Sequence, residues 1–273
     1  MQYVRKNLLA GIAALLLVAV PFSGPAMAAD AAKEVIKISV DPCTQPLAEE
    51  LAYAFSTKTK TKFQITQGKC KIGVDAARNE EATMGMTTQN IAELEPGLTK
   101  TVIAKAPIVF IVNRDNPVSN LTSKQLHDIL NGDVENWKQV GGKDEEIHNV
   151  MLEPCVKETV ARQMLDAPGY PDVKMLVPDV KFNAVKDTNK SVERHAGAIG
   201  QQIYGYESKN VKVLTIDGML PTPGLVPAKY RLYEDYNIIT KGEPKGAASE
   251  FIKFALSPEG QKIAEGLKHI PVK

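Results

Sequence analysis

Three cysteines occur in the 273-residue chain, and each follows an apolar, strand-like stretch and precedes a helical pattern. They are Cys43 in the run 41–44, Cys70 in the run 68–71 and Cys155 in the run 153–159. A cysteine at the amino end of a helix lies near unpaired backbone amides and the positive end of the helix dipole, which favour the thiolate over the thiol. The repeated placement predicts one shared task for the three sulfur atoms.

The neighbours of these cysteines do not favour catalysis. The chain has no Cys-x-x-Cys pair, no histidine within a cysteine-containing run and no glycine-rich cofactor loop. A nucleophilic cysteine needs a nearby base, and a dithiol oxidoreductase needs a cysteine pair. We therefore expect a binding protein that is not an enzyme and that carries no cofactor.

The amino end has the features of an export signal. Arg5 and Lys6 precede an apolar run over residues 8–20, and the small residues Ala26 and Ala28 flank Met27 at a cleavage motif. This pattern predicts a signal peptide over residues 1–28 and a mature protein in a Gram-negative periplasm. No later stretch approaches the roughly 20 apolar residues of a membrane span, so we expect no membrane insertion.

Charge and length narrow the class of partner. Cleavage of the signal would change the net charge from +1 to about −1, which leaves no basic excess for nucleic acid or a lipid surface. About 245 residues would remain, enough for one large domain or two modest ones. We expect a monomer that binds a small ligand.

An odd number of cysteines in an oxidising compartment leaves two interpretations open. In the first, a Cys43–Cys70 or Cys70–Cys155 disulfide forms and the remaining thiol is inert and buried. In the second, all three thiols stay free and contact one ligand. Their common position at strand-to-helix junctions favours the second interpretation.

Strand and helix patterns alternate along the chain, which indicates an α/β fold with mostly parallel sheets flanked by helices. We expect strands at 34–40, 62–66, 82–86, 104–112, 211–216 and 230–240, and helices at 47–55, 74–77, 122–130, 189–195, 246–256 and 258–267. Ligands of such sheets lie outside the carboxyl ends of the strands. The cysteines follow predicted strands and therefore belong to that edge.

Several multi-residue runs resemble those of the phosphate-type periplasmic binding proteins. They are residues 121–132, 136–142, 197–200, 213–222 and 251–261, in the same order as in that family. The resemblance implies a two-lobed periplasmic binding protein (type II) with two hinge crossings and a ligand held between the lobes. It places lobe 1 at residues 29–112 plus 221–273 and lobe 2 at residues 113–220.

The resemblance also implies where the ligand binds. Family members hold a tetrahedral oxyanion with serine and threonine hydroxyls and with amides at helix amino ends, helped by an arginine and an acid. The corresponding loops here are 40–44, 68–73, 85–88 and 151–159. The implied ligand-binding residues are Cys43, Thr44, Lys69, Cys70, Thr87, Thr88 and Cys155.

The chain departs from the family pattern at these loops. Cysteines stand where the family has serines in the first, second and fourth loops, and Thr87-Thr88 replaces the Ser-Arg of the third. The arginine ahead of the fourth-loop serine is absent. Lys69 supplies positive charge but lacks the bidentate fork of an arginine. The expected site has therefore lost guanidinium and hydroxyl groups and gained sulfur.

Three thiolates suit a soft, thiophilic ligand. Trivalent arsenic takes three sulfurs, copper(I) takes two or three, and zinc needs a fourth ligand. The four histidines, His127, His148, His195 and His269, share none of the cysteine loops. We therefore expect Cys43, Cys70 and Cys155 to bind arsenite or a related trivalent arsenical, which the protein would report to a membrane histidine kinase. The alternatives are an oxyanion (phosphate or arsenate) delivered to an ABC transporter permease, or another thiophilic metal such as copper(I).

Overall fold

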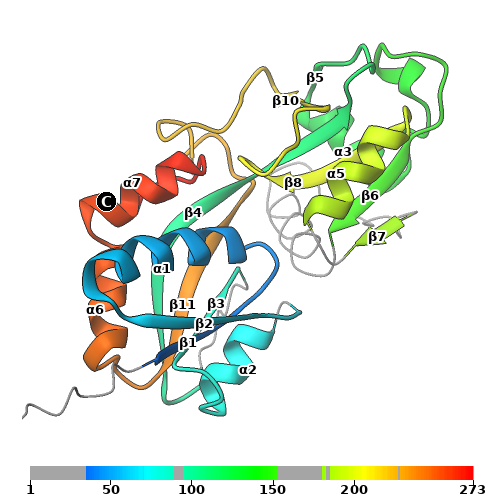
Figure 1. Ribbon diagram of the computed structural model, residues 1–273. Helices are drawn as coiled ribbons and strands as arrows, with labels where there is room; N and C mark the ends of the chain where they lie inside the picture. The colour runs from blue at the N-terminus through cyan, green and yellow to red at the C-terminus, as the bar shows by residue number, and fades with distance from the viewer. Residues whose placement is uncertain are drawn as a thin grey trace, which may run out of the picture. The chain divides into compact units, whose positions relative to one another are not determined.

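The computed structural model describes residues 35–69, 71–88, 95–152, 180–182, 185–226 and 228–272, which all belong to the unit Lys33–Lys273. The helices, shown in Figure 1, are α1 (Gln45–Thr59), α2 (Ile72–Arg78), α3 (Ser123–Asn131), the 3-10 helix η1 (Trp137–Val140), α5 (Val185–Arg194), α6 (Gly246–Ala255) and α7 (Pro258–Gly266). The strands are β1 (Val35–Val40), β2 (Lys62–Gln67), β3 (Met84–Thr87), β4 (Leu98–Asn113), β5 (Asn120–Leu121), β6 (His148–Leu152), β7 (Val180–Phe182), β8 (Ala198–Ile203), β9 (Val211–Val213), β10 (Thr215–Ile216) and β11 (Tyr233–Lys241).

The strands form one large mixed sheet and one small sheet. The large sheet has the order β2-β1-β3-β11-β4-β8-β6-β7, with β9 paired to β4, and the small one pairs β10 with β5. Pairing is parallel within β2-β1-β3 and within β8-β6-β7, but β11 and β4 between these groups are antiparallel to their neighbours. The expected α/β organisation is confirmed, although the described sheet is mixed.

Strand β4 changes partners along its length. Its first part, Leu98–Pro107, pairs with β11, and its second part, from Ile108 onward, pairs with β8. The change falls at Pro107, a residue that has no backbone N–H to donate to a neighbouring strand. Pro107 lies within the predicted strand 104–112, whose last residue is the predicted boundary of lobe 1; the lobe boundaries remain a prediction.

The first strand and helix follow directly from the residue pattern. Ile36, Ile38 and Val40 of β1 are buried, as alternation predicts. Leu47 and Leu51, one turn apart on α1, are also buried. Figure 1 shows that α1 lies with α6 and α7, which contact it. This packing fixes the amino end of α1 beside the carboxyl end of β1.

Each expected strand and helix has a counterpart, but one differs in kind. The stretch 211–216 was expected to be a single strand and is instead two strands, β9 and β10. The first pairs with β4 and the second with β5, so the chain changes its partner within six residues. Leu214, between the two strands, still donates its backbone N–H to Phe110 O at 2.8 Å.

Candidate functional site

The turn between β1 and α1 is built around the carboxylate of Asp41. Asp41 Oδ1 accepts hydrogen bonds from the backbone N–H groups of Cys43 (3.0 Å) and Thr44 (2.8 Å). Asp41 O accepts from the backbone N–H of Gln45 at 3.2 Å, and Pro42 has no N–H. Asp41 therefore satisfies the amide donors of the turn that leads into α1 within the chain.

The end of β3 is bonded to the same carboxylate. Asp41 Oδ2 accepts from Thr88 N (2.7 Å) and Thr88 Oγ1 (3.2 Å). Asp41 N donates to Met86 O at 3.2 Å, and Thr44 Oγ1 lies 3.1 Å from that oxygen. Asp41, Thr44 and Thr87 have no exposed surface. The first and third predicted ligand loops are thus joined through one fully buried acid.

The surroundings of Asp41 act on its ionisation in opposite directions. Burial raises the pKa of the Asp41 carboxyl above its ordinary value, and the hydrogen bonds from Thr88, Thr44 and Thr87 oppose that rise. The net direction is upward because removal from water outweighs the donated hydrogen bonds.

The thiol of Cys43 is free and completely buried. Its pKa is raised well above the ordinary value, first by burial and then by the negative charges of Glu234 and Asp41. The expectation that a helix amino end would favour the thiolate is therefore wrong for Cys43. Cys70 and Cys155 lie outside the described residues, so the disulfide alternatives stay predictions.

An aromatic cluster supports the Cys43 turn. Tyr236 on β11 is fully buried and donates its hydroxyl to Cys43 O at 2.7 Å. The rings of Tyr236 and His269 make an edge contact, with centroids 4.9 Å apart. His269 Nε2 lies 3.0 Å from the hydroxyl of Tyr206. These contacts fix the turn against the central strand of the sheet.

Two glycines allow α2 to pack closely on β3. A Cβ atom at Gly85 would lie 1.9 Å from Gly73 O, and one at Gly73 would lie 2.9 Å from Met86 O. Neither distance is possible for a real Cβ atom without movement of the backbone. The close approach places the second predicted loop, which leads into α2, beside the third.

The remaining predicted ligand residues are placed as follows. Lys69 is exposed, at the end of the described part of the second loop. Cys70 and Cys155, together with the fourth loop beyond Leu152, lie outside the described residues. The convergence of the three sulfur atoms is therefore not tested and stays a prediction. The described residues that do come together are Cys43, Thr44, Thr87 and Thr88.

Sequence reasoning did not assign a role to Asp41, Glu234 or Tyr236. Asp41 carries a recognisable signal, because an aspartate followed by proline between a strand and a helix is typical of a helix start. Glu234 and Tyr236 carry none, since they reach Cys43 from β11, almost 200 residues later. Their contribution depends on the pairing of β11 with β3 and β4.

No group of three or more His, Cys, Asp or Glu side chains within the described ranges is arranged to hold a metal ion. None of the helices in that part of the chain is long and apolar enough to cross a membrane.

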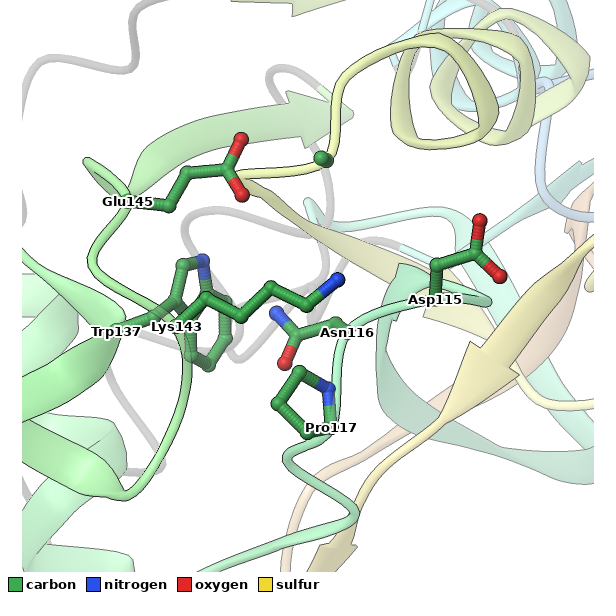
Figure 2. Close-up of a pocket in the computed structure, with 7 residues that line it drawn as sticks. Asp115, Asn116, Pro117, Trp137, Lys143 and Glu145 are labelled. Atoms are coloured by element: carbon green, nitrogen blue, oxygen red, sulfur yellow. The ribbon is translucent and has the colours of Figure 1, made fainter.

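A small pocket lies beside Trp137 (Figure 2). Its lining includes Asn116, Trp137 and Lys143, and Lys143 extends toward Asn116. The volume is about 10 Å³, which is near the minimum for one water molecule. Trp137 is 1% exposed and donates its indole N–H to Gly197 O at 2.9 Å. The pocket is too small for an oxyanion, and the buried Trp137 serves packing.

The chain belongs to the family described as the PBP superfamily domain, whose sequence profile matches residues 26–259. It is similar to the phosphate-binding protein PstS of Borreliella burgdorferi, with 24% identity over 249 residues, 85% of this chain and 88% of that protein. It is also similar to the PstS protein of Bacillus subtilis, with 27% identity over 248 residues, 87% of this chain and 80% of that protein.

Solved structures give the same assignment. A phosphate ABC transporter substrate-binding protein from Clostridium perfringens, solved with bound phosphate, matches with a TM-score of 0.78 and 28% identity over 88% of this chain and 100% of that chain. An ABC-type phosphate transport receptor from Vibrio cholerae shares the fold at 24% identity, with a TM-score of 0.68 over 86% of this chain. The expected two-lobed binding-protein fold is confirmed. The relatives are binding proteins, which confirms that the chain is not an enzyme.

Proposed function

We propose that the chain is an exported solute receptor that binds an inorganic oxyanion, with phosphate as the first candidate, and delivers it to the permease of an ABC transporter. The observation that carries this proposal is the likeness to phosphate-binding proteins over nearly the whole chain, together with the match to a phosphate-bound transporter receptor. The predicted signal peptide over residues 1–28 agrees with a periplasmic receptor. The partners are then a small anion and a membrane permease.

The predicted ligand loops retain groups that suit an oxyanion. Lys69 is exposed in the second loop and can contribute positive charge. The second loop leads into α2, and the fourth contains the run Cys155–Thr159 with a lysine and a threonine. Since the amides of the first loop are bonded to Asp41, this proposal places most of the anion's contacts in the second and fourth loops.

The proposal predicts that phosphate stabilises the protein against heat. A ligand that binds only the folded state adds about 2.7 kcal/mol of stability at a concentration one hundred times its Kd. We expect phosphate to raise the Tm of the reduced mature protein in a concentration-dependent way, and chloride at the same ionic strength to leave it unchanged. A Tm that does not respond to phosphate at millimolar concentration would contradict the assignment.

A second candidate is a receptor for arsenite or a related trivalent arsenical that reports to a histidine kinase. The observation that favours it is the free, buried thiol of Cys43 in the first ligand loop. Arsenite is an uncharged hydroxide, and three neutral thiols can replace its three hydroxides with release of three waters and no change in net charge. Copper(I) suits the site less well, because it needs thiolates, and burial together with the charges of Glu234 and Asp41 raises the pKa of the Cys43 thiol.

Substitution of single cysteines tests this second candidate. If three sulfurs share one arsenic atom, Cys43→Ser, Cys70→Ser and Cys155→Ser should each weaken arsenite binding by more than the roughly 1–3 kcal/mol of one lost buried contact. Calorimetry of the reduced protein with arsenite measures the effect, and the phosphate response of each variant is the control for folding. One silent substitution would exclude a three-sulfur site.

A further inference from the structure

We propose that Asp41 is a specificity-determining residue whose buried carboxylate makes the receptor prefer a singly charged oxyanion or an uncharged hydroxide to a doubly charged oxyanion. The inference rests on the proposed function and names the charge class of its ligand. Asp41 lies in the first of the loops implied to contact the ligand and is hydrogen-bonded to the third.

The backbone N–H groups just before α1 are already hydrogen-bonded to Asp41. A helix start can hold an anion through its unpaired N–H groups. Here the N–H groups of Cys43 and Thr44 are bonded to Asp41 Oδ1, and that of Gln45 to Asp41 O. Pro42 has no N–H. Residues 42–45, which lead into α1, therefore offer no backbone N–H to a ligand.

The loop after β3 is hydrogen-bonded to the same carboxylate. An ordinary helix cap explains the bonds to Asp41 Oδ1, but it does not require the second carboxylate oxygen to reach another loop. Asp41 Oδ2 nevertheless accepts from both Thr88 N and Thr88 Oγ1, 47 residues away in the chain. Asp41 thus also takes both donors that Thr88 would offer to an anion.

Two buried acids bring negative charge to this region. Asp41 is fully buried, and Glu234 is 2% exposed and contributes negative charge at neighbouring Cys43. A second anion close to a buried carboxylate is disfavoured, and the repulsion grows with the charge of that anion. A dianion would therefore be repelled more than a monoanion of the same shape, and an uncharged hydroxide would not be repelled.

Two substitutions of Asp41 separate the effect of its charge on ligand preference from its role as a hydrogen-bond acceptor for the turn before α1. Asp41→Asn keeps one acceptor oxygen for the amides of Cys43 and Thr44 but presents an NH₂ group to Thr88 and removes the charge. Asp41→Ser also keeps a capping oxygen and provides a second variant if the asparagine is not tolerated. Asp115→Asn, at an exposed acid in the loop after β4, is the matched control.

The readout is calorimetric titration at a mildly alkaline pH, where phosphate is a dianion and hypophosphite is a monoanion with a tetrahedral phosphorus that carries two oxygens and two hydrogens. We expect Asp41→Asn and Asp41→Ser to bind phosphate at least about tenfold more tightly than the native protein, with a much smaller gain for hypophosphite. The control Asp115→Asn should bind both anions as the native protein does. Circular dichroism checks that each variant is folded.

The remaining outcomes separate the inference from the proposed function. If only the Asp41 variants bind phosphate, the inference is supported and the assignment of phosphate to the native protein fails. A second outcome is that the native protein binds phosphate, while the Asp41 variants bind both anions with unchanged or lower affinity or gain the same affinity for both. In that case the inference is overturned and the proposed function stands. If no folded protein binds either anion, both are overturned.

Discussion

Replacing Gly85 by alanine is expected to lower the free energy of unfolding by about 3 kcal/mol, at the upper end of the usual effect of overpacking. The new Cβ atom would lie 1.9 Å from Gly73 O and 2.6 Å from Gly73 Cα. Both are backbone atoms, so no rotation of a side chain can relieve the clash. Helix α2 must move away from β3, and with it the second ligand loop.

Urea unfolding of Gly85→Ala beside Gly266→Ala tests this expectation. Gly266 ends α7, has no heavy atom within 4 Å of a built Cβ and does not have a positive φ. An alanine there should be neutral or stabilising by up to about 1 kcal/mol, because glycine is a poor helix former. Equal unfolding midpoints for Gly85→Ala and the native protein would show that α2 does not pack on β3 as described.

Protonation of His269 is expected to destabilise the protein by about 3 kcal/mol when the pH falls from neutral to below 4. His269 is 1% exposed, and burial lowers its pKa from 6.5 to about 4. Between these values the unfolded chain binds more protons than the folded one, so this contribution to stability is complete above pH 6.5 and is lost as the pH falls through about 4. The magnitude follows from 1.36 kcal/mol for each pKa unit.

The measurement compares denaturant unfolding at neutral and acidic pH in the native protein and in His269→Gln. Carboxyl groups also titrate in this range, but they titrate in both proteins, so the difference isolates His269. Glutamine can still bond to the hydroxyl of Tyr206. His195→Gln, at an exposed histidine, is the matched control. If His269→Gln loses as much stability on acidification as the native protein, burial of His269 does not have the described effect.

Much of the fold follows from local residue patterns. Alternating apolar residues predict β1 and β11, and helical spacing predicts α1, α3 and the closing pair α6 and α7. The boundaries were less well predicted. Strand β4 begins at Leu98, six residues before the predicted start, because its first half contains the polar residues Thr99, Lys100 and Thr101 and becomes a strand through pairing with β11.

The candidate site was only partly predictable, because its properties come from distant parts of the chain. The location of Cys43 at a strand-to-helix junction follows from the sequence. Its protonation state does not, since the helix end favours a thiolate while burial and the charges of Glu234 and Asp41 favour the thiol. The bonds of Asp41 to Thr88 likewise depend on the parallel pairing of β1 with β3.

The central claim is that this chain is an anion receptor of the phosphate-binding class, and isothermal titration of the reduced mature protein tests it most directly. The protein is titrated separately with phosphate and with arsenite under identical conditions. We expect saturable binding of phosphate with one anion per chain. No heat with phosphate together with stoichiometric binding of arsenite would contradict it and would favour the cysteine-based receptor.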